Sequence, residues 1–241
     1  ILSSVNCPTN IMKVLILAAG RSKRMKPIED KNFLSFLGKP LIQRQIEMVA
    51  GLGFEEIILV GGRHNLGRFE ELVSGMDVNV RLVEQVDLDA GMQGAVLAAR
   101  DFVGNDPLLI FSSNDVVDTS AFEMVKKASL EGDAESYILG KKVSKYFPGG
   151  YLSVDKDGII SNIVEKPGEG NEPSDMVNLV VHLHKNPGKL IEYLESVSSE
   201  NDDKYEVALA EMMKDGVKMK AVEYDGFWQP IKFPWHIMNV A

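Results

Sequence analysis

A small, basic loop at residues 17–25 is the first stretch whose side chains suit chemistry. The apolar run 14–17 gives way to small residues at 18–20, and the cations Arg21, Lys23 and Arg24 follow. Small residues let a ligand approach the backbone closely, and exposed N–H groups with cations behind them suit a polyphosphate. The same pattern also fits an ordinary strand–loop connection whose cations are solvated, so the loop alone does not settle its use.

Two further polar clusters, at residues 84–85 and 114–115, also come directly after apolar runs. Gln85 carries both a donor and an acceptor, which is enough to recognise the edge of a base. Asp115 is a natural oxygen ligand for Mg²⁺ if it faces a phosphate-binding loop. The alternative role for Asp115 is a helix cap, but the residues at 118–120 are better placed for that.

A second group of candidates lies outside these clusters. Lys31, eleven residues beyond Gly20, could hold a phosphate on the other side of a reacting centre. Glu165 and Lys166 end an apolar run in the second half of the chain and could hold a second substrate, with Asn178 in the next run. Taken singly, each of these residues is better explained as a solvated surface residue.

The elements that must position these residues alternate in type over the first 115 residues. Apolar runs alternate with helical periodicity, which predicts parallel strands with right-handed crossovers. Because the carboxyl ends of parallel strands share one edge of a sheet, the loop, Gln85 and Asp115 are expected to converge on one cleft. The second half predicts further strands, and we expect one domain over residues 12–241 with a loose extension at 1–11. The predicted strands are 14–17, 56–60, 78–83, 107–111, 136–142, 150–154, 159–164 and 177–184, and the predicted helices are 40–52, 69–73, 91–102, 189–197 and 205–213.

Composition narrows the possible partners. The 241 residues carry a net charge of −9, which argues against nucleic acid as a partner. The single cysteine, Cys7, excludes an internal disulfide. No apolar run approaches a membrane span, so the sequence predicts a cytoplasmic protein without membrane contact. His182 and His184 stand two apart on one strand, where a structural role is favoured over a metal pair.

With these motifs in order, the chain resembles the sugar-1-phosphate nucleotidyltransferases. This group includes glucose-1-phosphate thymidylyl- and uridylyltransferases and the pyrophosphorylase half of N-acetylglucosamine-1-phosphate uridylyltransferase. The resemblance covers roughly residues 12–238. The motifs that carry it are Leu17-Ala-Ala-Gly20 with Arg24-Met25, Lys31, Gly38-Lys-Pro-Leu-Ile42, Glu84-Gln85 with Gly91, Asn114-Asp115, Gly150-Tyr151, Val164-Glu-Lys-Pro167, Asn178, Gly226-Phe-Trp228 and Pro234-Trp235.

The resemblance implies a Rossmann-like three-layer α/β/α fold, that of the nucleotide-diphospho-sugar transferases, with a mixed, mostly parallel sheet. It implies attack of a sugar-1-phosphate oxygen on the α-phosphorus of a nucleoside triphosphate, with Mg²⁺ as cofactor, pyrophosphate as leaving group and no covalent enzyme intermediate. By the pattern of the family, Arg24 would hold the triphosphate, Lys31 would neutralise charge at the transferred phosphate and Asp115 would bind Mg²⁺. The nucleotide would be bound by Leu17, Ala18, Ala19, Gly20, Ser22, Lys23, Gln85, Gly91 and Met92, and the sugar by Gly150, Glu165, Lys166 and Asn178.

The chain departs from the pattern of the family in three places. Ser22 and Lys23 replace the usual second glycine of the loop and the Ser or Thr after it, and Met92 replaces a Thr. Pro230 stands where the family often places an Asp or Asn that binds metal. A proline has no side-chain oxygen, so Gln229, Asp225 or water would have to substitute.

Three functions are therefore open from the sequence. The first is an active enzyme that uses UTP or dTTP, which Gln85 favours. The second is a cytidylyltransferase acting on phosphocholine or another small phosphate ester, which Ser22 in the loop permits. The third, favoured by Pro230 and Met92, is a catalytically silent nucleotide-sugar-binding regulatory or assembly subunit. A homo-oligomer is possible in each case.

Overall fold

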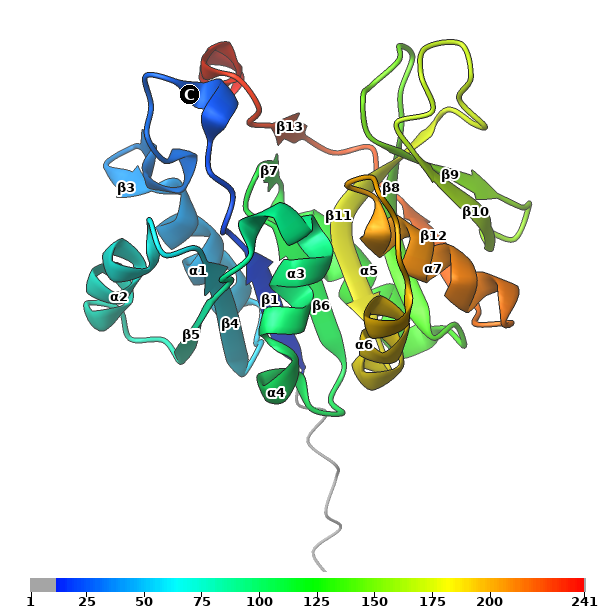
Figure 1. Ribbon diagram of the computed structural model, residues 1–241, viewed down its shortest axis with the longest axis horizontal. Helices are drawn as coiled ribbons and strands as arrows, with labels where there is room; N and C mark the ends of the chain where they lie inside the picture. Colours follow the sequence, from blue (N-terminus) through cyan, green and yellow to red (C-terminus); the bar gives the residue numbers. More distant parts are fainter. Residues whose placement is uncertain (1–11, 241) are drawn as a thin grey trace, which may run out of the picture.

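The structure is a computed structural model that describes residues 12–240, so the expected extension at 1–11 lies outside the described residues. Four parallel strands build the first half of a mixed nine-stranded sheet, in the order β6-β1-β4-β5 (Figure 1). The predicted parallel pairing is confirmed. These strands are β1 (Lys13–Leu17), β4 (Glu56–Gly61), β5 (Val80–Glu84) and β6 (Leu108–Ser112).

The second half of the sheet is built around a long strand, β11, which runs antiparallel to β6. β11 pairs with β8 along its other edge and with β9 near its start, and β12 extends the sheet beyond β8. The pairing of β11 with β8 shifts between Asn178 and His182, so β11 bends between the two halves. These strands are β8 (Ser136–Lys142), β9 (Gly150–Val154), β10 (Ile160–Glu165), β11 (Met176–His184) and β12 (Met219–Glu223).

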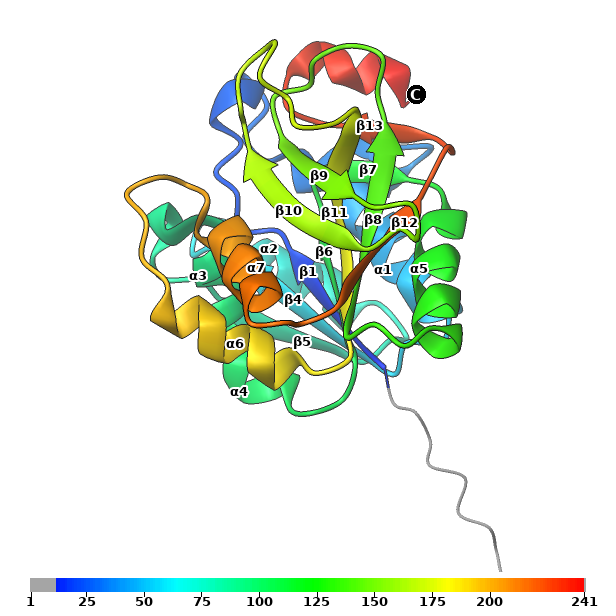
Figure 2. The same cartoon turned by 90° about the vertical axis from the view of Figure 1, so that its right-hand side faces the viewer.

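Helices cover both faces of the sheet, which gives the three layers that Figure 2 shows edge-on. Val14 and Ile16 of β1 pack with one set of helices, whereas Leu15 and Leu17 pack with the other. Alternate residues of this strand therefore enter different cores, which is why its sequence is apolar throughout. One face carries α1 (Leu41–Gly51), α2 (Leu66–Ser74) and α5 (Thr119–Glu131), and the other carries α3 (Gly91–Ala98), α4 (Arg100–Val103), α6 (Pro187–Ser196) and α7 (Lys204–Lys214).

Short elements lie beyond the carboxyl ends of the parallel strands and frame the space above them (Figure 1). β7 (Asp115–Val117) pairs with β13 (Trp228–Pro230), which returns the last part of the chain to the end of β6. The remaining short elements are the hairpin β2 (Ser35–Phe36) and β3 (Lys39–Pro40) and the 3-10 turns η1 (Lys23–Met25), η2 (Lys31–Phe33), η3 (Leu88–Ala90) and η4 (Pro234–Asn239).

The expected elements are present, with corrections at their ends. The helix predicted at 91–102 is two helices, because the α-helical hydrogen bonding is interrupted at Ala99, whose N–H bonds to the carbonyl of Val96 three residues back. β5 begins at Val80 rather than at residue 78, and β12 and β13 had no predicted counterpart. Within residues 12–240, no helix combines the length and apolar character needed to cross a membrane.

Candidate active site

A cleft of about 630 Å³ opens where the parallel strands end, between the two halves of the sheet. The basic loop, the end of β5 and the start of β7 line one side of it, and β9, β10 and β11 line the other. The predicted convergence of the sites is therefore confirmed. The predicted site residues that line the cleft are Leu17, Ala19, Gly20, Arg24, Gln85, Gly91, Met92, Asp115, Gly150, Glu165, Lys166 and Asn178.

Four predicted residues, Ala18, Ser22, Lys23 and Lys31, do not line the cleft. Ala18 faces the core, where its carbonyl accepts hydrogen bonds from the amides of Asn32 and Asn65 at 3.1 and 3.0 Å. The hydroxyl of Ser22 accepts the backbone N–H of Lys31, and the side chain of Lys23 is exposed outside the cleft. Ala18 and Ser22 thus shape the loop from behind rather than presenting side chains to a ligand.

Gln85, at the end of β5, is fixed by its own loop. Its side-chain amide nitrogen donates to the carbonyls of Asp87 and Gly91, at 2.8 and 2.9 Å. Both amide protons are therefore used inside the protein, and the amide oxygen is left as the group that can bind a ligand. Gly91 has φ +56°, and a Cβ there would collide with the carboxylate of Asp202. Only glycine allows this close approach.

Asp115, the first residue of β7, is held by the indole of Trp228, whose N–H donates to its carboxylate at 3.1 Å. The β7–β13 register places Asp115 directly opposite Pro230. Burial raises the pKa of Asp115, whereas the Trp228 hydrogen bond and the charges of Lys232 and Lys31 act to lower it. The carboxylate therefore sits close to two lysine ammonium groups.

Lys31 is buried behind Asp115, with 8% of its surface exposed. Its ammonium donates to the carbonyl of Ile231 at 3.1 Å, so it also fixes the segment that follows β13. Burial lowers its pKa to about 8, against the opposing effect of Asp115. The neighbouring Lys232, which the sequence analysis did not single out, lines the cleft itself.

The opposite wall is acidic. Lys166 pairs with Glu165 at 2.9 Å, and Gly150 permits close packing because a Cβ there would lie 3.1 Å from the Glu165 carboxylate. Two further carboxylates line the cleft: Glu206 lies near Glu165, and Asp202 lies between Glu206 and Gly91. Burial, followed by the nearby charge of Glu165, raises the pKa of Glu206 to about 8. Apart from their charge, nothing in the sequence around the start of α7 indicated that these two residues would line the cleft.

Asn178 is oriented by a buried chain of hydrogen bonds through two histidines. The Nε2 of His182 lies 2.8 Å from the Asn178 side-chain oxygen, and its Nδ1 lies 2.9 Å from the hydroxyl of Tyr205. The same hydroxyl lies 3.1 Å from Nε2 of His184, whose Nδ1 meets Ser136 at 2.8 Å. The structural role expected for both histidines is thereby confirmed.

The charge state of the histidines sets the direction of this chain. Burial lowers the pKa of His182 to about 3 and that of His184 to about 4, so both rings are neutral. Because the Asn178 oxygen can only accept, Nε2 of His182 carries the proton, and the Tyr205 hydroxyl donates to Nδ1 of the same ring. Tyr205 in turn accepts from His184, which accepts from Ser136. The amide nitrogen of Asn178 is left to donate elsewhere.

The donor set near Asp115 fits a metal ion carried by a phosphate chain. Among residues 12–240, no three His, Cys, Asp or Glu side chains gather as a metal site. One carboxylate with substrate phosphates and water is the coordination that Mg²⁺ commonly takes in proteins. Gln229 and Asp225, the expected substitutes for the oxygen that Pro230 lacks, do not line the cleft. The Gln229 amide is instead engaged with the Pro230 carbonyl and with Asn239.

Comparison with known proteins identifies the family. Residues 13–231 match the model of the family described as nucleotidyl transferase. The chain belongs to this family. Nucleotidyl transferases of this kind generally use a divalent metal ion, and the resemblance seen in the sequence motifs is confirmed at this level.

Relatives and solved structures agree with this assignment. The chain is 31% identical over 234 residues to a bifunctional sugar-1-phosphate nucleotidylyltransferase/acetyltransferase of Sulfurisphaera tokodaii, covering 95% of this nucleotidyl transferase and 54% of the relative. It is 25% identical over 250 residues to a UTP–glucose-1-phosphate uridylyltransferase of Staphylococcus haemolyticus, covering 90% and 86%. It thus spans about half the length of the first of these relatives. The expected fold is confirmed by the crystal structure of an apo UDP-glucose pyrophosphorylase, which superposes with a TM-score of 0.81 at 19% identity, covering 95% and 96%.

Proposed function

We propose that this chain transfers a nucleoside monophosphate from UTP or dTTP to a sugar-1-phosphate and releases pyrophosphate. The observation that carries the proposal is the division of charge in one cleft. Arg24, Lys232 and the carboxylate of Asp115 lie on the side of the basic loop, and the Glu165–Lys166 pair lies on the other. A triphosphate fits the first side and a hydroxyl-rich sugar the second, so their phosphates would meet between them.

The reaction that we propose is a direct displacement. One oxygen of the sugar phosphate forms a bond to the α-phosphorus, and the bond from that phosphorus to the oxygen bridging to the β-phosphorus breaks. Pyrophosphate leaves with the electron pair. The sugar phosphate is already anionic, so no side chain has to remove a proton, and catalysis rests on placement and charge neutralisation.

The side chains divide this work by position. Arg24, whose guanidinium lies 5.6 Å from the centre of the Phe233 ring, would hold the triphosphate. Lys31, buried beside Asp115, would reduce the negative charge felt at the transferred phosphate. Asp115 would hold Mg²⁺, which when bound neutralises charge on the phosphate oxygens. Asn178 would donate its amide N–H to a sugar oxygen, since its own oxygen is engaged by His182.

Gln85 would recognise the base through its side-chain amide oxygen. Its amide oxygen accepts, so the base that binds it must present an N–H, as the N3–H of uracil and thymine does. Cytosine presents an amino group and is the competing choice, which keeps the cytidylyltransferase open for test. Gly91 would lie against the ring, and Met92, in place of a hydroxyl-bearing residue, would add only apolar contact.

A silent nucleotide-sugar-binding subunit is the second candidate, and Pro230 is the observation that favours it. The position opposite Asp115 has no side-chain oxygen, so the protein supplies fewer metal ligands than the pattern of the family. The charges needed for transfer are nevertheless present around Asp115. We therefore favour the enzyme.

One assay separates these functions. Pyrophosphate release is measured with Mg²⁺ for UTP, dTTP and CTP, each paired with a panel of sugar-1-phosphates and with phosphocholine. We expect turnover with UTP or dTTP and a sugar-1-phosphate, and its loss in Asp115→Ala. Turnover only with CTP and phosphocholine would support the cytidylyltransferase. Tight binding of a nucleotide sugar with no turnover of any pair would support the silent subunit.

A further inference from the structure

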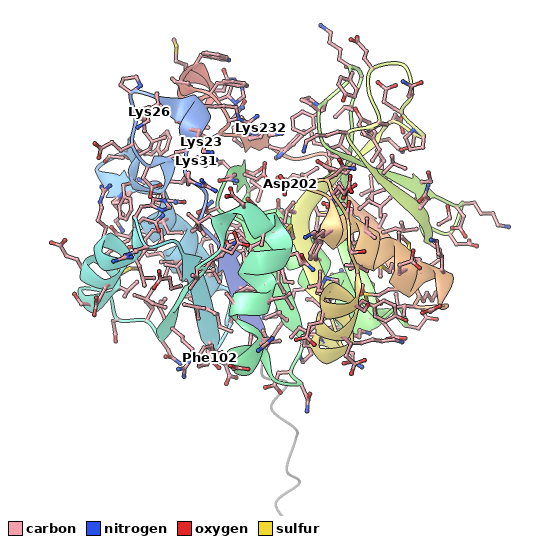
Figure 3. The ribbon with its side chains drawn as sticks, in the orientation of Figure 1. Lys23, Lys26, Lys31, Phe102, Asp202 and Lys232 are labelled. Atoms are coloured by element: carbon pink, nitrogen blue, oxygen red, sulfur yellow. The ribbon has the colours of Figure 1, made fainter. Side chains whose placement is uncertain are left out.

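Lys232 is a cation on the rim of the cleft that no sequence motif pointed to. Its side chain is half-buried and lines the same cleft as Asp115 and Arg24. Figure 3 shows it between the side of the molecule that carries Lys31 and the side that carries Asp202. It therefore stands between the two walls of the cleft, where the two proposed substrates would meet.

The ammonium of Lys232 is held in place from the sugar side. It donates to the carbonyl of Pro148 at 3.2 Å and lies 4.2 Å from the centre of the Phe147 ring. The Phe147 ring packs in turn against Trp228, with ring centres 4.7 Å apart. Since Trp228 donates to Asp115, the cation and the carboxylate are positioned by one connected set of contacts.

The backbone beneath Lys232 is fixed as firmly. Ile231 is fully buried, its N–H donates to the carbonyl of Asn114 at 2.8 Å, and its carbonyl accepts the ammonium of Lys31. The Nδ1 of His236 lies 2.5 Å from the Pro230 carbonyl and 3.2 Å from the backbone nitrogen of Lys232, so this ring packs closely against the segment. A side chain with this much support is pre-organised, which is what charge stabilisation in a reaction needs.

Charged side chains from both walls of the cleft act on the Lys232 ammonium. Asp115 and Glu165 act on it as opposite charges, and Arg24 and Lys166 act as like charges. Asp115 and Arg24 belong to one wall and Glu165 and Lys166 to the other, so Lys232 is within electrostatic reach of both walls. Two residues before Lys232, Pro230 faces Asp115 and adds no side-chain oxygen of its own as a metal ligand.

We propose that Lys232 is a catalytic residue whose ammonium contacts the acceptor phosphate and the α-phosphate. The ammonium supplies positive charge at a place where Pro230 offers no side chain to hold a metal ion. This rests on the proposed function of the cleft. Lys232 forms no covalent bond and transfers no proton. Its charge offsets the repulsion between the two phosphates as the new phosphorus–oxygen bond forms and the bond to pyrophosphate breaks. Lys31 fixes the segment from below through Ile231.

The test replaces Lys232 by Met, which keeps the length and apolar packing but removes the charge, and by Arg, which keeps the charge. The matched control is Lys26→Met, which removes one charge from an exposed lysine that does not line the cleft. Turnover is measured with Mg²⁺ and the substrate pair that the wild type uses best. Affinities for UTP and for glucose-1-phosphate are measured separately by calorimetry, and folding is checked by thermal unfolding.

For Lys232→Met we expect kcat to fall about 100-fold, as for the loss of one charge-stabilising donor in other enzymes. We expect glucose-1-phosphate binding to weaken several-fold, UTP binding to stay within about threefold, and Lys232→Arg to recover most of the loss. The proposal is overturned if Lys232→Met keeps both kcat and glucose-1-phosphate affinity, if Lys26→Met loses as much, or if Lys232→Arg recovers nothing.

The failure of the proposed function would be seen separately. If the wild type turns over no substrate pair, the selective loss of glucose-1-phosphate binding in Lys232→Met still supports the phosphate contact, and unchanged binding overturns it. If Lys232→Met does not fold, Lys232→Gln takes its place against Lys232→Arg, and the same outcomes are read from that pair.

Discussion

Replacing Tyr205 by Phe tests whether the buried hydrogen-bond chain behind Asn178 both stabilises the fold and orients the sugar side of the cleft. The Tyr205 hydroxyl is the middle link of this chain, between His182 and His184. All three side chains are at most 1% exposed, so no water replaces the lost group from the surface. Phe fills the same volume, and the substitution therefore removes the hydrogen bonds without opening a large cavity.

The expected cost follows from the two groups left without a partner. The Nδ1 of His182 loses its donor and the Nε2–H of His184 loses its acceptor. Each unsatisfied buried group costs about 1–3 kcal/mol, so the free energy of unfolding should fall by about 3 kcal/mol. For a chain of this size, that corresponds to a fall of roughly 6–12 °C in the unfolding midpoint. His182 would also be freer to turn, which loosens its hold on the Asn178 oxygen.

Urea unfolding measures the first effect, and substrate kinetics measure the second. The KM for the sugar phosphate should rise several-fold while the affinity for the nucleoside triphosphate stays unchanged. Tyr193→Phe is the matched control, because the Tyr193 hydroxyl donates to Asp215 at the surface, and its loss should leave both quantities near those of the wild type. A loss below about 1 kcal/mol with an unchanged KM would refute this reasoning.

Three further predictions concern the same cleft and its supports. Gly91→Ala should weaken nucleotide binding and lower stability by about 1–3 kcal/mol, because an Ala is strained at φ +56° and its Cβ collides with Asp202; equal affinity in calorimetry would contradict this. The pKa of Glu206 is raised to about 8, so the folded state binds its proton more tightly and this stabilisation is lost as the pH rises toward 8. Between pH 6 and pH 8, the free energy of unfolding should therefore fall less in Glu206→Gln than in the wild type, and the difference should be on the order of 2 kcal/mol in urea unfolding. Parallel pH profiles of the two proteins would contradict this. The lowered pKa values of His182 and His184 act in the opposite sense. Their contribution to the free energy of unfolding is present above pH 6.5 and falls by roughly 3 kcal/mol per pH unit below it. If replacing both histidines by Gln leaves the loss of stability in acid unchanged, the histidines are not its cause.

The central strands and their shared edge could be predicted because the relevant signals are local. A strand buried on both faces must be apolar along its length, as residues 14–17 are, and the polar residues that follow it are conspicuous. Gln85 and Asp115 were found in this way. Both lie in the predicted cleft, because parallel strands place their carboxyl ends together.

The remaining parts depend on contacts between distant residues. Lys31 was expected in the cleft, but its ammonium reaches the carbonyl of Ile231, 200 residues away in the sequence. Lys232 enters the cleft only because β13 pairs with β7, and a three-residue strand containing a proline gives no periodic signal. Asp202 and Glu206 resemble the charged residues of any helix start until α7 is placed against the cleft.

The uneven charge of the cleft would also select at the far end of the sugar that we propose it binds. A phosphorylated sugar that carries a carboxylate away from its phosphate would approach Asp202 and Glu165 with like charge, which is unfavourable in a partly enclosed site. Neutral sugars meet no such repulsion, and amine-bearing sugars are attracted. We expect a sugar acid phosphate to compete poorly with its neutral counterpart in the pyrophosphate assay, and less poorly once Asp202 is replaced by Asn.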